Sequence, residues 1–202
     1  MNILAFDTCL DKMYVTLAID GEVKESRIVL NHDEKYHSAF LISTIKDVLK
    51  KNNIKPEDID LIATNIGPGS FTGIRACTTV ARVMAQQLSC KCIGISSLEI
   101  LSKITGEKSC PVALDARKNK AYFYFENEIK GAVDIEEVKA LLKGKQFITD
   151  NKLQQIIGGN SYQETEAKLG DILAKLAYEK YENCDCDWRK LKPLYIQPPP
   201  MG

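Results

Sequence analysis

The order in which strands and helices are predicted along this chain constrains its fold most strongly. Three segments with alternating apolar residues open the sequence, at 3–6, 14–19 and 25–30, and Asp20-Gly21 suits a tight turn between the last two. They predict an antiparallel three-stranded meander. The elements expected after it are a helix over 38–51, a buried strand over 59–66, a helix over 70–89, a strand over 90–95 and a short helix over 96–104.

A reduced copy of this order follows. The polar residues 106–109 mark the expected boundary between an N-terminal lobe over 1–105 and a smaller lobe over 106–202, whose C-terminal segment we expect to pack back on the first lobe. The pattern predicts an α/β protein of two lobes, each a mixed sheet with flanking helices. The second lobe is expected to contain strands over 111–115, 121–126, 130–133 and 146–149 and helices over 135–142 and 164–181.

Composition excludes several classes of protein. The chain has 202 residues, 45% of them hydrophobic, which is enough for a buried core. Its 27 Lys and Arg balance 27 Asp and Glu, so it lacks the basic excess of free-standing nucleic-acid-binding proteins. Apolar runs are far shorter than the roughly 20 residues that span a bilayer. The first strand begins at residue 3 without a leader pattern, so we expect a cytoplasmic protein with no membrane contact.

The helix over 70–89 has an unusually wide apolar face. Its small and apolar residues fill an arc of roughly 200°, where a surface helix needs about 100°. Arg75 and Arg82 share the opposite stripe. Either the second lobe covers part of the arc, or another protein docks on it. The arc contains Val83, Ala76, Gln87, Val80, Gly73, Met84, Cys77, Leu88, Ala81, Ile74 and Ala85.

A glycine-rich turn precedes this helix. Gly67-Pro68-Gly69 breaks the preceding strand, and Ser70 or Thr72 can cap the helix. Glycines and free amides at a helix N-terminus suit an anion, but the same glycines are needed merely to turn the chain. Both interpretations remain open from the sequence.

Asp7 and Asp115 each end the first strand of a predicted lobe. Paired aspartates at such positions occur in folds whose hairpins hold nucleotide phosphates and a metal. Glycine would have to follow each aspartate for backbone amides to approach a phosphate, and here Thr8-Cys9 and Ala116-Arg117 follow instead. We therefore expect degenerate phosphate loops at Asp7, Thr8 and Asp115 and weak nucleotide binding at most. The alternative function is a small ATP-dependent kinase or ATPase that uses both aspartates with magnesium.

Other chemistry is poorly supported. His32 and His37 are five residues apart, so they do not share a helical face as metal ligands would. Cys184 and Cys186 are spaced as half of a metal site, but no second Cys or His pair is near them in the sequence. No pair of nucleophile and base is recognisable. The sequence predicts neither a catalytic residue nor a metal site.

Six short motifs follow one another along the chain. They are Phe6-Asp7-Thr8, His37-Ser38, Gly67-Pro68-Gly69-Ser70-Phe71-Thr72-Gly73-Ile74-Arg75, Gly94-Ile95-Ser96-Ser97-Leu98, Leu114-Asp115-Ala116-Arg117 and Pro193-Leu194-Tyr195. Their order and spacing resemble the TsaB family, formerly called YeaZ, and the match is good over residues 1–126. Gln197 departs from the family, whose members usually carry a basic residue there.

This resemblance implies two actin-like, ribonuclease H-like lobes and no catalytic activity. The family is similar to a shortened TsaD, the catalytic subunit whose metal is held by histidines just after the strand corresponding to 90–95. Here Ser96-Ser97-Leu98-Glu99 stands at that place. The implied role is a scaffold that pairs with TsaD and supports the ATPase TsaE, so that threonylcarbamoyl reaches N6 of adenosine 37 in tRNAs reading ANN codons. ATP and magnesium would be used by the complex.

The family's partner surface is formed by the first two helices, and it also forms homodimers when the partner is absent. That implication favours docking as the explanation of the wide apolar arc. tRNA contact is expected only through the complex, to which Arg75, Arg82, Arg117, Lys118 and Lys120 could add positive charge. The residues expected at the partner interface are Gly73, Ala76, Thr79, Val80, Val83 and Gln87.

Overall fold

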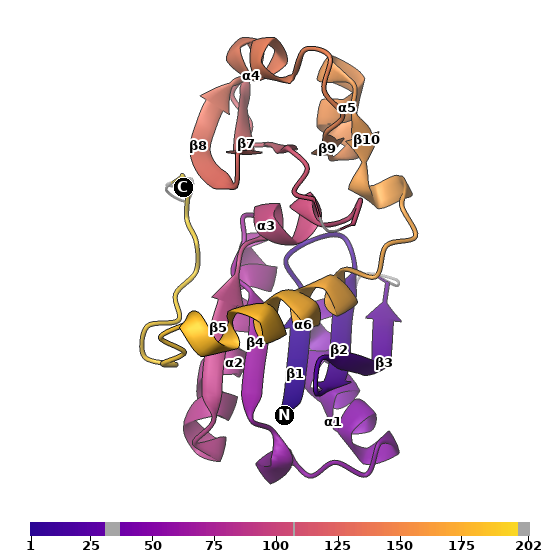
Figure 1. Cartoon of the computed structure of the whole chain (residues 1–202), viewed down its shortest axis with the longest axis vertical. Coiled ribbons are helices and arrows are strands. Elements are labelled where there is room, and N and C mark those ends of the chain that lie inside the picture. The colour runs from indigo at the N-terminus through magenta and orange to yellow at the C-terminus, as the bar shows by residue number, and fades with distance from the viewer. Residues whose placement is uncertain (31–36, 107, 198–202) are drawn as a thin grey trace. The chain divides into compact units, whose positions relative to one another are not determined.

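The computed structural model describes residues 1–30, 37–106 and 108–197, so His32 and the final prolines lie outside the described residues (Figure 1). Two five-stranded sheets organise the chain. Contacts divide the described residues into one unit of 1–97 with 168–194 and another of 98–167 with 195–197. This is the predicted α/β class, with two mixed sheets flanked by helices. No helix in the described ranges is long and apolar enough to cross a membrane.

The sheet of the first unit has the strand order β3-β2-β1-β4-β5. β1, β2 and β3 form the predicted antiparallel meander, and β4 and β5 add to β1 in parallel. All residues of β4 are buried, because helices pack on both faces of the sheet. The strands are β1 (Asn2–Asp7), β2 (Met13–Ile19), β3 (Glu22–Val29), β4 (Leu61–Asn65) and β5 (Lys91–Ile95).

Helices α1 and α2 lie behind this sheet in Figure 1, and α6 crosses its front. Buried residues of α1 and α2 join one hydrophobic core with β1, β2 and β4. The predicted first helix is in fact a 3-10 turn followed by α1. The helices and turns that begin in this unit are η1 (His37–Phe40), α1 (Leu41–Lys51), η2 (Pro56–Asp58), α2 (Phe71–Leu88), α3 (Ser97–Ser102), α6 (Leu169–Lys180) and η4 (Tyr181–Asn183).

The predicted start of the last helix at residue 164 was wrong. Residues Tyr162–Glu164 form the 3-10 turn η3, Thr165 is extended, and α6 begins at Leu169. α6 packs on the first sheet, where a Cβ on Gly170 would meet Thr16 Oγ1 at 2.4 Å. Glycine at this position therefore lets the helix lie directly on β2.

The segment after α6 runs beside β5. The amide of Cys92 donates to the carbonyl of Cys186 at 2.9 Å, and the amide of Leu194 donates to Ile66 O at 2.8 Å. Leu191 is buried in the core of the first unit. Cys184 and Cys186 are joined to each other as a disulfide rather than forming half of a metal site.

The second sheet has the order β10-β9-β6-β7-β8. It repeats the meander of the first sheet and adds two short parallel strands. α5 was not predicted from the sequence, although Asp150 caps it by accepting from the amide of Leu153 at 2.8 Å. Its elements are β6 (Val112–Asp115), β7 (Lys120–Phe125), β8 (Glu128–Asp134), α4 (Ile135–Leu142), β9 (Ile148–Thr149), α5 (Asn151–Ile157) and β10 (Asn160–Ser161).

Glu25 joins the edge strand β3 to the end of α1. Its carboxylate accepts from Arg27 Nε at 2.6 Å, Lys51 Nζ at 3.1 Å and Asn52 Nδ2 at 2.7 Å. These hydrogen bonds lower the pKa of Glu25 from 4.5 to about 2, and the bond from Arg27 has the largest effect. A carboxyl whose pKa is lower in the folded state stabilises the fold above its unfolded pKa, and this contribution disappears as the pH falls toward 2.

We therefore expect Glu25→Gln to lower the free energy of unfolding by about 1 kcal/mol at pH 7, because the partners are largely exposed and solvent weakens the ion pairs. Urea unfolding should show this difference shrinking to nothing near pH 2. Glu22→Gln is the control, since Glu22 pairs only with Lys24 among the ion pairs described and is exposed. A difference for Glu25→Gln that is equal at pH 7 and pH 2 would contradict the assignment.

Candidate functional site

The glycine-rich turn packs directly on the loop between β1 and β2. Ser70 caps α2, since its Oγ accepts from the amide of Gly73 at 3.3 Å, and its own amide donates to Cys9 O at 2.7 Å. Thr72 lies in the first turn of α2 and is exposed. The turn is therefore tied to the β1–β2 loop by main-chain contacts.

Two glycines make this close approach possible. A Cβ on Gly73 would lie 1.8 Å from Thr8 O, and one on Gly69 would lie 2.3 Å from Cys9 O. Both distances are far below contact between a carbon and an oxygen. Gly67 has φ of +98°, a backbone conformation that glycine adopts without strain, so glycine suits this position in the turn. Gly73 is buried against the chain's own backbone, so the expectation that it touches a partner needs correction.

The rest of α2 separates into two sides. Ile74, Cys77 and Ala81 are buried against the sheet. Ala76 and Val80 are half-buried, and the exposed residues of the expected interface are Thr79, Val83 and Gln87. The sheet of the first unit thus covers only part of the wide apolar arc.

Exposed apolar side chains also occur on the elements before α2. Ile42 of α1 is 57% exposed and Val83 is 52% exposed, and η1, which contacts both α1 and α2, carries the partly exposed Phe40. Large apolar side chains left in water are typical of protein interfaces. We use the name α1–α2 face for the set Phe40, Ile42, Ala76, Val80 and Val83.

The end of β1 is a buried polar network. The carboxylate of Asp7 accepts from the amide of Cys9 at 2.6 Å and from Asn65 Nδ2 at 2.9 Å. Thr8 donates its amide to Cys77 Sγ at 3.1 Å and its hydroxyl to Gly73 O at 2.9 Å. The amides that a phosphate would need at the start of this loop are therefore engaged inside the protein.

Asn65 is a part of this network that the sequence analysis missed. It ends β4 and is fully buried. Its Oδ1 accepts from the amide of Gly67 at 2.8 Å and from Ser97 Oγ at 3.0 Å, while its amide nitrogen holds Asp7. The signal that could have found it is a polar amide at the end of an otherwise apolar buried strand.

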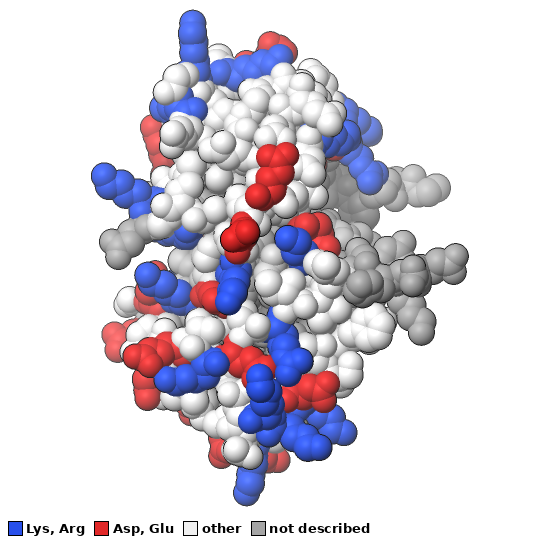
Figure 2. Space-filling model, turned by 90° about the vertical axis from the view of Figure 1, so that its right-hand side faces the viewer, with Lys and Arg blue, Asp and Glu red and all other residues white. Residues whose placement is uncertain are grey.

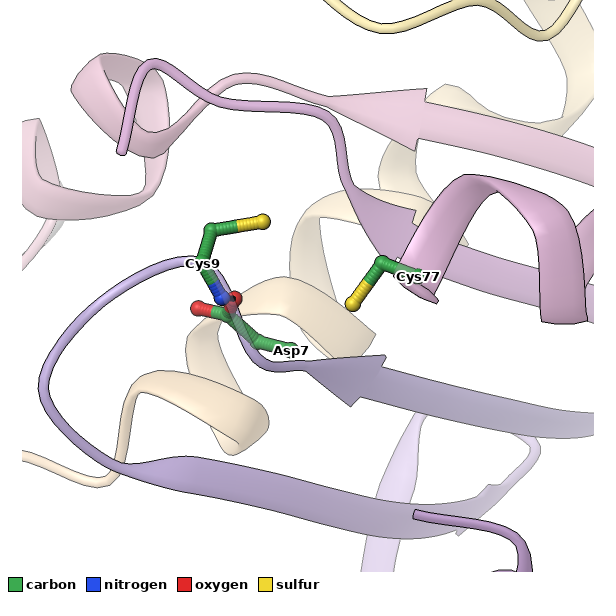
Figure 3. A group of neighbouring side chains, drawn as sticks. All are labelled: Asp7, Cys9 and Cys77. Carbon is green, nitrogen blue, oxygen red and sulfur yellow. Dashed lines mark hydrogen bonds between the residues drawn. The ribbon is translucent and has the colours of Figure 1, made fainter. Parts of the chain in front are cut away.

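Figure 3 shows Asp7, Cys9 and Cys77, whose ligand-type atoms all lie within 4.8 Å of one another. All three side chains are buried. Burial, followed by the neighbouring Cys77 and Asp7, raises the pKa of the Cys9 thiol well above its ordinary value, so the thiol is protonated at neutral pH. Among the described residues, these are the ones placed to hold a metal, and no sequence pattern connects Cys9 with Cys77.

Asp115 lies in the second unit, at the end of β6. Its carboxylate forms an ion pair with Lys152 of α5 and accepts from the amide of Arg117 at 3.1 Å. The amide of Asp115 donates to Asp150 Oδ2 at 2.6 Å. Asp115 is thus held by α5, the helix that the sequence analysis missed.

The chain is similar to proteins of tRNA modification. The family model described as "TsaD: tRNA N6-adenosine threonylcarbamoyltransferase" matches residues 27–182. The tRNA threonylcarbamoyladenosine biosynthesis protein TsaB of Escherichia coli is 29% identical over 78% of this chain and 68% of its own length. The Bacillus subtilis protein of the same name is 31% identical over 50% of this chain and 44% of its own length. The chain belongs to the TsaD family, in its TsaB/YeaZ branch.

A solved structure shows the same fold. YeaZ from Pseudomonas aeruginosa superposes with a TM-score of 0.75 over 96% of this chain and 99% of that chain, at 20% identity. Two actin-like, ribonuclease H-like lobes are therefore the architecture of this TsaB/YeaZ member. The sequence matches to other TsaB proteins cover only about half of their length, such as 55% and 52% for two of them.

Charge on this TsaB/YeaZ member is mixed. On the face drawn in Figure 2, basic and acidic side chains are interspersed over the lower part of the molecule. The guanidinium carbon of Arg75 lies 4.0 Å from the centre of the Phe71 ring, so the aromatic ring of Phe71 holds this basic side chain of α2 in place. This distribution agrees with the balanced composition and gives no support to tRNA binding by the chain alone.

Proposed function

We propose that this chain is a non-catalytic scaffold subunit needed for threonylcarbamoyl transfer to N6 of adenosine 37 in tRNAs that read ANN codons. It acts by forming a heterodimer with a TsaD transferase and by supporting the complex that contains TsaE. The observation that carries the proposal is the α1–α2 face, an apolar surface that the sheet of its own unit leaves exposed in a member of the TsaB/YeaZ branch. A second copy of the chain takes this face when the partner is absent.

The contacts of Asp7 and Asp115 support a subunit without catalytic activity. Asp7 is enclosed by Cys9 and Asn65, and Asp115 is neutralised by Lys152. The nearby amides of Thr8, Cys9 and Asp115 donate to groups of the protein rather than to a phosphate. ATP and magnesium are therefore assigned to the complex, with weak nucleotide binding at most by this chain. tRNA is reached through the complex, in the cytoplasm.

Reconstitution tests the scaffold function. TsaD, TsaE, tRNA, threonine, bicarbonate, magnesium and ATP are combined with and without this chain, and modified adenosine is measured by mass spectrometry of digested tRNA. The scaffold function predicts that omission of the chain removes the product. Undiminished product without the chain would contradict it.

The alternative is a small kinase or ATPase that uses Asp7 and Asp115. It predicts micromolar binding of ATP with magnesium to the isolated chain, whereas the scaffold function predicts no binding in that range. Isothermal titration calorimetry distinguishes the two. Tight binding that Asp7→Asn abolishes would favour the enzyme.

A further inference from the structure

Asp7, Cys9 and Cys77 bring three possible metal ligands together from three parts of the first unit. Asp7 ends β1, Cys9 lies in the loop that follows, and Cys77 lies in the second turn of α2. All three are at most 1% exposed. Figure 3 shows the sulfur of Cys77 directed from the helix toward the end of β1 and the loop that follows it.

Each ligand atom is oriented by a neighbouring group. Asn65 Nδ2 donates to Asp7 Oδ2 at 2.9 Å, the amide of Thr8 donates to Cys77 Sγ at 3.1 Å, and Cys9 Sγ donates to Asn65 O at 3.3 Å. Such outer contacts are what fix the direction of ligands in protein metal sites. The cluster therefore has the ordered second layer that a metal site requires.

We propose that Asp7, Cys9 and Cys77 form a binding site for a thiophilic divalent cation such as Zn²⁺ or Cd²⁺. Two thiolates and a carboxylate are a donor set that zinc accepts, with zinc–sulfur distances of about 2.3 Å. Two thiolates around a tetrahedral zinc ion lie about 3.8 Å apart. The three ligand atoms, now within 4.8 Å of one another, need to close by no more than about 1 Å. The main-chain carbonyl oxygen of Asn65, which lies 3.3 Å from Cys9 Sγ, would be the fourth ligand of the metal.

Metal binding would release two protons from the chain. The S–H bonds of Cys9 and Cys77 break, two sulfur–metal bonds form, and two protons leave to solvent. No electron is transferred, and the carboxylate of Asp7 becomes the third ligand. The bound ion would join the second turn of α2 to the end of β1.

The test uses Cd²⁺ alone and the full chain. Cys184 and Cys186 are first replaced by serine, because this pair could bind the ion when its disulfide is reduced. The protein is unfolded, refolded with Cd²⁺ and desalted, and the metal content is measured together with the cadmium NMR shift, which reports the number of thiolate ligands. We expect one Cd²⁺ per chain, bound by two thiolates.

Two variants and one control complete the test. Cys77→Ser and Asp7→Asn, introduced separately into the same background, should each weaken Cd²⁺ binding by about 100-fold or more. Cys110→Ser, which removes a half-buried thiol outside the cluster, should leave binding unchanged. Circular dichroism identifies any variant that fails to fold, and Asp7→Asn then stands in for Cys77→Ser. The proposal is overturned if the refolded background protein retains no Cd²⁺, or if a folded Cys77→Ser or Asp7→Asn protein retains as much.

Discussion

Replacing Val83 by glutamate is expected to abolish the proposed binding of this chain to a TsaD protein without unfolding the chain. Val83 is 52% exposed, so a charge there remains in water in the free protein, and its free energy of unfolding should change by no more than about 0.5 kcal/mol. In the complex the same charge would be buried without a partner. That costs about 3 kcal/mol or more, a fall in affinity of over about 100-fold. Calorimetric titration with TsaD measures it.

Ile156→Glu is the matched control for this prediction. Ile156 is 50% exposed and helical, but it lies on α5 in the second unit and outside the α1–α2 face. Its replacement should leave the affinity for TsaD unchanged. If Val83→Glu bound TsaD as well as the unaltered chain, or if both variants lost binding equally, the α1–α2 face would be the wrong surface.

The second large effect is expected for Gly73→Ala. Helix propensity alone predicts that alanine inside a helix stabilises by about 1 kcal/mol relative to glycine. The geometry predicts the opposite sign, because the new Cβ would lie 1.8 Å from Thr8 O and 2.7 Å from its carbonyl carbon. Backbone atoms on both sides would have to move, so we expect a loss of about 3 kcal/mol in the free energy of unfolding.

Thermal and urea unfolding check this prediction, with Thr79→Ala as the control on the exposed side of the same helix. Thr79→Ala removes a β-branched residue and should be neutral or slightly stabilising. A Gly73→Ala protein as stable as the unaltered chain would show that α2 is not seated on the β1–β2 loop as described.

The sequence predicted the first sheet well because its signals are local. Alternation defined the meander, a continuous apolar run defined β4, and the turn at Gly67-Pro68-Gly69 marked the start of α2. Helical periodicity also placed Ile74, Cys77 and Ala81, which are buried, and the more exposed Val83 on one wide apolar arc. These patterns depend on each element's own residues.

The remaining features depend on residues far apart in the chain. The contact of Gly73 with Thr8 joins α2 to the loop after β1, and neither periodicity nor the family resemblance indicated it. Lys152 reaches Asp115 from α5, a helix of one or two turns with a weak pattern. The approach of Cys9 to Cys77 likewise follows only from the packed fold. Sequence periodicity carries no information about such pairs.

Hydrogen exchange of the chain with and without TsaD tests the central claim most directly. Peptides from η1, α1 and the exposed side of α2 should exchange more slowly in the complex, while those from α4 and α5 keep the rates of the free chain. Slower exchange confined to the second unit, with α2 unchanged, would contradict a scaffold that holds its partner through the α1–α2 face.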